Sequence, residues 1–178
     1  ILVAGVAGLV SGAMSMAAGE YVSVSAQADT EKADLAREKQ ELTEDYPFEV
    51  RELAGIYETR GLTPDLARQV AEQLMNKDAL GAHARDELGI SEITTARPLQ
   101  AAFASAVTFS VGAALPLLAV VAAPLGLVVP AVVVATLVSL TSLGIAGAMA
   151  GGAGIVHSVT RVVFWGSLAM AITAGVGG

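Results

Sequence analysis

The sequence contains no cysteine, few aromatic residues and, over long stretches, no charge at all. The absence of cysteine excludes disulfide bonds and metal sites built on thiolates. Aromatic residues make up only 4% of the chain, whereas 54% of its residues are hydrophobic and 19 are Gly. Small apolar side chains suit helices that pack closely in lipid, and the mean hydropathy of +0.64 exceeds that of an ordinary soluble domain. The composition therefore predicts a membrane protein.

The sequence also lacks several motifs that are typical of enzymes and of nucleic-acid-binding proteins. It has no Gly-rich phosphate loop, no nucleophile elbow, no zinc-protease helix and no cluster of aromatic residues for stacking on bases. These absences point away from an enzyme and from nucleic-acid binding. We therefore expect neither activity, and no prosthetic group.

Charge is confined to one part of the chain. Residues 1–19 and 98–160 contain no Asp, Glu, Lys or Arg. Nine of the ten basic residues and sixteen of the seventeen acidic residues lie between residues 27 and 97, and the exceptions are Glu20 and Arg161. This pattern indicates an apolar segment, a polar insert and a long apolar tract.

The apolar segments are long enough to cross a membrane, because a hydrocarbon core of about 30 Å needs about 20 helical residues. Residues 1–26 fit one span, and residues 98–178 have room for three, at about 99–122, 126–149 and 157–177. Pro116 and Pro130 predict kinks within these spans. The expected fold class is all-α, a polytopic helical membrane protein with a helical polar insert at residues 27–97.

The orientation follows from the basic residues. Those of the insert and Arg161 fall on the same side of the membrane if four spans are threaded in order, and the positive-inside rule makes that side cytoplasmic. The richness in Ala, Gly and Val and the very short loops favour a bacterial plasma membrane, whereas a vacuolar membrane fits a eukaryotic source.

The insert begins with a stripe of acidic residues at steps of three and four, which share one face of a helix: Glu31, Asp34, Glu38, Glu41 and Asp45. We expect this helix to continue the first span without a break and to end at Pro47. Three further helices are expected, at about 47–59, 64–76 and 78–88. The first of them carries Glu49 and Glu52, and the last carries His83 and Glu87.

Two interpretations of these acidic residues stand side by side. Runs of charge are commonly only solvated faces, and the Lys and Arg residues of the same helix partly neutralise this one. If the helices fold back on one another, however, carboxylates and an imidazole converge, and such a donor set binds Fe²⁺, Mn²⁺ or Zn²⁺. Without metal, the carboxylates of such a cluster would have raised and coupled pKa values.

Glu20 is the single carboxylate in the first apolar segment, and it shares a helical face with Met16. An ionisable group within a membrane is costly and by default indicates an ion or proton route. The alternative is that Glu20 lies close enough to the cytoplasmic end to anchor the helix at the lipid headgroups. We favour a transport pathway through Met16 and Glu20.

The run "SMAAGEYVSVSAQ", the acid-rich helix after it, "ELAGIYETRGL" and "DELGI" resemble the vacuolar iron transporter family, over essentially the whole chain. The resemblance implies a homodimer in a lipid bilayer with a cytoplasmic metal-binding domain. Its members export Fe²⁺, often Mn²⁺, from the cytoplasm in exchange for protons. The bound metal is then a substrate and not a cofactor.

The family's cytoplasmic carboxylates correspond here to Glu38, Glu41, Glu49, Glu52 and Glu87, and its membrane methionine corresponds to Met16, with Glu20 in the same signature. His83 stands where the family often has a methionine, which changes the softness of the site. The family's first span, with an aspartate in a "DG" context, has no counterpart in these residues. We therefore expect a fragment or a divergent form, in which transport by this chain alone is in question.

Two other functions fit the same residues. The insert could be a membrane-tethered metal buffer or sensor that binds metal without moving it. A membrane scaffold whose acidic insert binds a basic partner would instead show binding that is sensitive to salt and indifferent to divalent metal.

Overall fold

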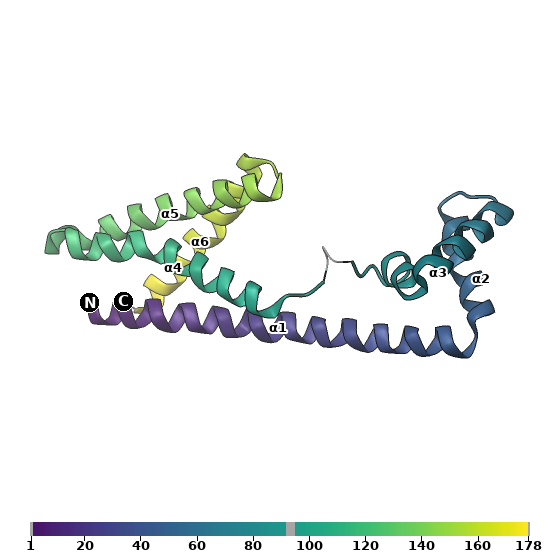
Figure 1. Cartoon of the computed structure of the whole chain (residues 1–178). Helices are drawn as coiled ribbons and strands as arrows, with labels where there is room; N and C mark the ends of the chain where they lie inside the picture. The colour runs from purple at the N-terminus through teal and green to yellow at the C-terminus, as the bar shows by residue number, and fades with distance from the viewer. Residues whose placement is uncertain (1, 92–94, 178) are drawn as a thin grey trace. The chain divides into compact units, whose positions relative to one another are not determined.

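The computed structural model describes residues 2–91 and 95–177, and within them it contains helices and turns but no strand. The elements follow the order α1 (Leu2–Glu44), α2 (Tyr46–Thr59), α3 (Pro64–Asp86), α4 (Pro98–Ala122), the 3-10 helix η1 (Leu125–Leu127), α5 (Val128–Gly151) and α6 (Ile155–Gly177) (Figure 1). The predicted all-α class is confirmed. The chain divides into two units, residues 1–19 with 102–178 and residues 20–101.

The first unit is built from apolar helices. Among the described residues, four helical segments are long and apolar enough to cross a membrane: α1, α4, η1 with α5, and α6. The last three have 22 to 27 residues and mean hydropathies of 1.5 to 2.2. At 1.5 Å per residue each exceeds the roughly 30 Å of a hydrocarbon core. The protein is a polytopic helical membrane protein.

Glycines let α5 and α6 approach closely. A Cβ atom added to Gly144 of α5 would lie 3.0 Å from the Cα atom of Val159 in α6. One added to Gly166 of α6 would lie 2.5 Å from the side chain of Leu140 in α5. Without a hydrophobic effect to drive helix association in lipid, such close backbone packing is a main source of stability.

The two prolines of the apolar tract differ in position. Pro116 lies inside α4, where it removes a helical hydrogen bond as expected. Pro130 is the third residue of α5, so it belongs to the first turn. The N–H groups of a first turn have no partner within the helix, and proline costs nothing there. A kink within the span at Pro130 is therefore not required.

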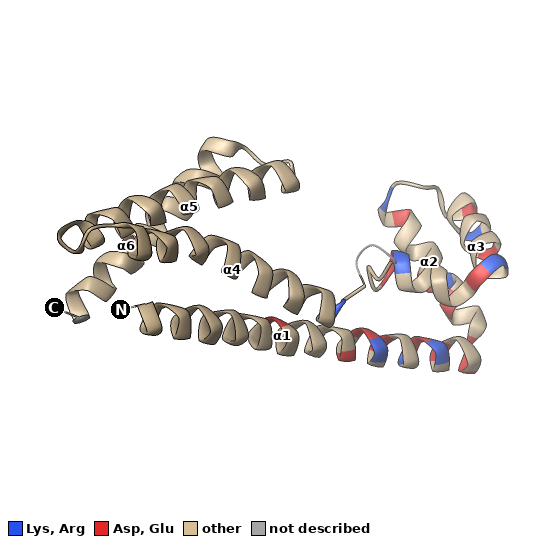
Figure 2. Cartoon of the chain, turned by 60° about the vertical axis from the view of Figure 1, so that its left-hand side comes forward, with Lys and Arg blue, Asp and Glu red and all other residues tan. Residues whose placement is uncertain are grey.

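Charged residues gather on the second unit, along the C-terminal half of α1 and on α2 and α3 (Figure 2). As predicted, α1 continues from the apolar segment into the acidic one without a break. Asp45 alone separates α1 from α2, and its side chain caps α2 by accepting a hydrogen bond of 3.0 Å from the N–H of Phe48. Pro47, in the first turn of α2, cannot continue α1.

The helices α2 and α3 pack around a small apolar core. Leu53 of α2 is fully buried, and so are Ala67 and Ala71 of α3. The chain turns between the helices at Gly61, whose φ of 99° is accessible mainly to glycine. The alanines let the two helices lie close together, which brings their polar residues within reach of α1.

The helix α3 is interrupted at Asp78, where φ is −163° and ψ is 91°. The carboxylate of Asp78 accepts a hydrogen bond of 3.0 Å from the N–H of Gly81 and so caps the segment that follows. The two helices predicted at 64–76 and 78–88 are thus present as two segments of one interrupted helix. His83 belongs to the second segment, and its direction depends on this interruption.

Candidate metal centre

Three helices bring together the side chains of Glu38 from α1, Glu49 from α2 and His83 from α3. Each offers one ligand atom, and these atoms lie within 4.8 Å of one another. All three residues are buried, with exposed fractions of 3%, 4% and 0% respectively. Buried charged groups are rare unless they are paired or bind metal. We refer to Glu38, Glu49 and His83 as the buried cluster.

One nitrogen of the imidazole faces several carboxylates. The Nδ1 atom of His83 lies 3.1 Å from Oε1 of Glu38 and 3.8 Å from Oε2 of Glu49. It lies 2.8 Å from Oε2 of Glu87, which follows the last residue of α3. A single proton on Nδ1 can satisfy only one of these oxygens well.

Three buried polar atoms of the cluster have no hydrogen-bond partner in the described part of the chain: Nε2 of His83, and Oε1 of Glu38 and Oε2 of Glu49, whose contacts with Nδ1 of His83 are ion-pair contacts without a hydrogen bond. Each such atom costs on the order of 1–3 kcal/mol, so its persistence needs an explanation. Carboxylate oxygens and imidazole nitrogens are the donors that divalent Fe, Mn and Zn accept. The donor set fits a transition-metal ion.

The carboxyl groups of Glu38 and Glu49 lie in surroundings that favour the binding of a cation. Burial raises the pKa of Glu38 to about 7; the charge of His83 opposes this shift, and those of Glu87 and Glu49 add to it. Burial also raises the pKa of Glu49, with a further contribution from the charge of Glu52. A bound divalent cation would stabilise the ionised forms that burial and mutual repulsion disfavour.

Glu41 and Glu52 are not in the buried cluster. They line a neighbouring pocket of about 400 Å³ together with Arg37, Glu44, Asp45, Phe48, Glu49 and Glu87. Because Glu49 belongs to both the cluster and this acidic pocket, the two are continuous. The pocket leads from exposed carboxylates to the buried ones.

The first two residues of the predicted acidic stripe, Asp34 and Glu31, have partners outside the buried cluster. Asp34 pairs with Arg37 on the same helix. Glu31 accepts hydrogen bonds from the side chain of Gln27, at 3.1 Å, and from the backbone N–H of Ala96, also at 3.1 Å. The predicted acidic face is present along α1 from Glu31 to Glu41, and its first two carboxylates are engaged by neighbouring groups of the protein.

The predicted pathway residues lie on α1 outside the buried cluster. Met16 is 48% exposed and lines an apolar pocket of about 450 Å³ in the membrane unit, together with Thr108, Phe109, Gly112, Ala113, Pro116, Thr136, Ser139, Leu140 and Leu143. Ser139 is buried. Glu20, one helical turn beyond Met16, is exposed. Their role stays a prediction.

Sequence reasoning did not mark Glu44 as a site residue, and it placed Asp45 in the acidic stripe without assigning it to the metal site, although both line the acidic pocket. Glu44 lies three residues after Glu41, and this spacing, which places the two on one helical face, could have indicated it. Sequence reasoning also missed Asp86, which joins α2 to α3 through hydrogen bonds from Tyr57 and Arg60. Local spacing in the sequence does not predict these contacts, because Asp86 lies 26 or more positions from Tyr57 and Arg60.

Four apolar helices and an acidic, histidine-containing cluster in a separate unit define a polytopic membrane protein with a candidate metal centre. The model of the VIT family matches residues 1–178. The chain belongs to the VIT family.

Curated relatives agree with this assignment. A protein of Acanthamoeba castellanii named "Vacuolar iron transporter" is 44% identical over 178 residues, which cover 99% of this chain and 68% of the relative. Two rice proteins named "Vacuolar iron transporter homolog 1" and "homolog 2" are each 38% identical over 99% of this chain, covering 58% and 71% of the relatives. The chain thus spans about three fifths to seven tenths of the length of these relatives.

Proposed function

We propose that this protein transports a divalent transition metal, with Fe²⁺ as the principal substrate and Mn²⁺ as a second, out of the cytoplasm in exchange for protons. Residues 27–97 form the cytoplasmic metal-binding domain, and residues 1–26 and 98–178 form the spans. The names of the curated relatives support iron as the substrate. They also favour a transporter over an enzyme.

The observation that carries this proposal is the buried cluster. Two carboxylates and an imidazole from three different helices point their ligand atoms at one another, although burial makes their charges costly. A fold that only needed to be stable would fill this position with apolar side chains. The mixed oxygen and nitrogen donors favour Fe²⁺, Mn²⁺ or Zn²⁺ over Mg²⁺, which prefers oxygen and retains its water.

The acidic pocket supports a route to the cluster. Glu41 and Glu52 attract the hydrated cation, and Glu49 and Glu87 belong both to the pocket and to the surroundings of His83. The ion exchanges water for protein ligands as it moves from the exposed carboxylates to the buried ones. Protons displaced from Glu38 and Glu49 leave as the metal binds.

We propose that Met16 and Glu20 act in the membrane step. Both lie on α1, the helix that also carries Glu38. Met16 offers a thioether to the dehydrated ion, and Glu20 offers a carboxylate that binds either metal or proton, which would couple export to proton entry. A homodimer would surround such a path with protein and not with lipid.

The relatives reported above come from an amoeba and a plant, so they give no support to the bacterial plasma membrane that composition favoured. The protein is an integral membrane protein, and for a eukaryotic source we propose the vacuolar membrane as its location.

Transport is tested with the purified protein in vesicles that have an acidic interior. We expect Fe²⁺ to accumulate inside, and accumulation to be lost in Glu38→Gln/Glu49→Gln. The matched control Glu58→Gln/Glu72→Gln changes two carboxylates of α2 and α3 that lie outside the cluster, the exposed Glu58 and the half-buried Glu72, and should transport normally. Glu20→Gln should stop transport while Fe²⁺ binding at the cluster persists. Undiminished transport by Glu38→Gln/Glu49→Gln would contradict the proposed role of the cluster.

The alternative function is a membrane-tethered metal buffer or sensor. It is favoured by one observation: the converging buried ligands lie in the polar unit, whereas Met16 and Glu20 are exposed. A buffer predicts tight Fe²⁺ binding with no accumulation in the vesicles at any proton gradient.

A further inference from the structure

We propose that Asp86 is a positioning residue for the candidate metal centre, because it fixes the end of α3 against α2 and thereby sets where Glu87 presents its carboxylate to His83. This inference rests on the proposed metal binding. Asp86 itself is not a ligand in the proposal, and it acts only through its neighbour.

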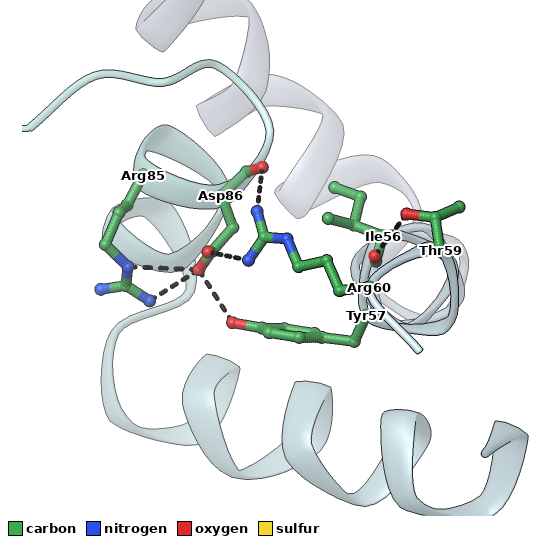
Figure 3. Close-up of polar contacts among 6 residues, drawn as sticks. All are labelled: Ile56, Tyr57, Thr59, Arg60, Arg85 and Asp86. Carbon is green, nitrogen blue, oxygen red and sulfur yellow. Dashed lines mark hydrogen bonds and ion pairs between the residues drawn. The ribbon is translucent and has the colours of Figure 1, made fainter. Parts of the chain in front are cut away.

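Asp86, drawn in Figure 3, is the last residue of α3. Its side chain is only 9% exposed. Its Oδ2 atom accepts hydrogen bonds from the hydroxyl of Tyr57, at 2.9 Å, and from Nη2 of Arg85, at 2.7 Å. Its Oδ1 atom accepts one from Nη1 of Arg60, at 2.6 Å. Figure 3 shows the side chains of Tyr57, Arg60 and Arg85 directed at this single carboxylate.

Arg60 also caps α3. A second guanidinium nitrogen, Nη2, donates to the backbone carbonyl of Asp86 at 3.0 Å. The last carbonyls of a helix have no partner within the helix, and the end of the helix dipole there favours a cation. Arg60 follows the last residue of α2, and its guanidinium lies 5.2 Å from the ring centre of Tyr57. Two side chains at the end of α2 therefore hold the end of α3.

Glu87 follows directly after Asp86, the residue that Tyr57 and Arg60 hold in place. The backbone N–H of Glu87 donates to the carbonyl of His83 at 2.9 Å, and that of Leu88 donates to the same carbonyl at 3.1 Å. These bonds fix the backbone of Glu87 directly next to Asp86, and its Oε2 atom lies 2.8 Å from Nδ1 of His83. A shift at Asp86 would therefore move the carboxylate that contacts the imidazole.

Asp86 also determines where the positive charges of Arg60 and Arg85 lie. Arg60 and Arg85 are held by Asp86, one residue from a carboxylate of the candidate centre. Without Asp86, either guanidinium would be available to pair with Glu87 and would compete with a metal ion for it. The pKa of Asp86 is held below its usual range, because the hydrogen bonds from Arg60, Arg85 and Tyr57 outweigh the opposing effect of burial.

The test measures Fe²⁺ affinity of the full chain in detergent under anaerobic conditions. We expect Asp86→Asn, which keeps the shape of the side chain, to weaken binding by about 10- to 100-fold with the same number of ions bound, as residues behind a ligand commonly do. Tyr57→Phe removes one hydrogen bond and should cost a few-fold. The control Glu72→Gln changes net charge equally on the same helix, where Glu72 pairs with Arg68, and should bind as the wild type does.

A second measurement separates positioning from general stability. In a Glu87→Gln background, Asp86→Asn should weaken Fe²⁺ binding less than about two-fold further, since the effect passes through Glu87. Equal losses in both backgrounds would overturn the proposal, and so would an unchanged affinity in Asp86→Asn. If Asp86→Asn does not fold, Tyr57→Phe takes its place in the same comparison of the wild-type and Glu87→Gln backgrounds. A wild-type protein that binds no Fe²⁺ would overturn this inference and the proposed function together.

Discussion

His83 gives the candidate centre its nitrogen donor. Its side chain is fully buried, and its Nδ1 atom lies within 3.8 Å of three carboxylates. Imidazole is a better ligand for Fe²⁺ and Zn²⁺ than for Mg²⁺. This residue should therefore decide which ions the centre accepts.

We predict that His83→Leu lowers the affinity for Fe²⁺ and Zn²⁺ by at least about 100-fold, since losing a ligand should exceed the 10- to 100-fold effect of losing a residue behind one. Anaerobic titration of the full chain measures this. The control His157→Leu removes the other histidine, which lies exposed on α6. Equal losses from both substitutions would contradict a specific role for His83.

Glu38 makes the stability of the metal-free insert depend on pH. Its pKa is raised from 4.5 to about 7 by burial, with His83 of α3 opposing and the carboxylates of Glu87, Glu49 and Glu41 adding to the shift. A raised carboxyl pKa means that the folded state binds the proton more tightly. The stabilisation of the folded insert by this proton is complete below the pKa that Glu38 has in the unfolded state, and it is lost as the pH rises through 7.

We therefore predict that the metal-free insert is less stable at pH 8 than at pH 5, by on the order of 3 kcal/mol from Glu38 alone. Amide hydrogen exchange of α2 and α3 in the full chain, at matched intrinsic rates, measures the difference. Glu38→Gln should remove most of it. Fe²⁺ affinity should change in the opposite direction and rise between pH 5 and pH 8, because protons compete for the same oxygens.

At the scale of elements, the interruption of α3 sets the direction of the segment that carries His83. Asp78 caps this segment through its bond to the N–H of Gly81. We predict that Asp78→Ala destabilises the segment by about 1 kcal/mol and weakens Fe²⁺ binding, whereas Asp78→Ser keeps a capping oxygen and stays close to wild type. Hydrogen exchange after Asp78 and metal titration report the two effects. Identical behaviour of Ala and Ser would show that the cap is dispensable.

The packing of α2 on α3 depends on Leu53, which is fully buried. Leu53→Ala should lower the free energy of unfolding of the insert by about 2–5 kcal/mol, because it removes apolar contact and leaves a cavity. Leu66→Ala, at a position 50% exposed, should change it by less than about 0.5 kcal/mol. Hydrogen exchange of α2 and α3 distinguishes the two, and similar losses would contradict this account of the core.

The sequence was sufficient to place the helices and insufficient to pair their side chains. Pro47, Gly61 and Pro64 act through local backbone geometry, and the structure begins or ends a helix within two residues of each of them. Glu38 and Glu41, by contrast, share one helical face, and only Glu38 is buried. Which of the two meets His83 depends on how α2 and α3 pack, and this is not encoded in local spacing.

At the scale of the whole molecule, one helix carries residues of both proposed steps. Met16, Glu20 and Glu38 all lie on α1, as the absence of a breaker between them predicted. The distribution of charge predicted an insert at residues 27–97, and the compact unit of the structure that contains it spans residues 20–101. Met16 belongs to the unit of residues 1–19 and 102–178, whereas Glu20 and Glu38 belong to the unit of residues 20–101, so α1 carries residues of the proposed transport route in both units.

Metal should stabilise only one of these units. At a free Fe²⁺ concentration 100 times the dissociation constant, we predict a gain of about 2.7 kcal/mol. Hydrogen exchange should slow in α2 and α3 and stay unchanged in α5 and α6. Protection that is equal in both units, or that Mg²⁺ reproduces, would contradict a transition-metal centre in the insert.

The central claim is that the buried cluster binds a transition-metal ion, and anaerobic titration of the full chain in detergent with Fe²⁺ tests it most directly. The wild type and Glu58→Gln/Glu72→Gln should bind Fe²⁺ with the same affinity and ignore Mg²⁺, while Glu38→Gln/Glu49→Gln should lose the binding. A wild-type protein that binds no Fe²⁺, or a cluster variant that binds it as tightly as the control, would contradict the account.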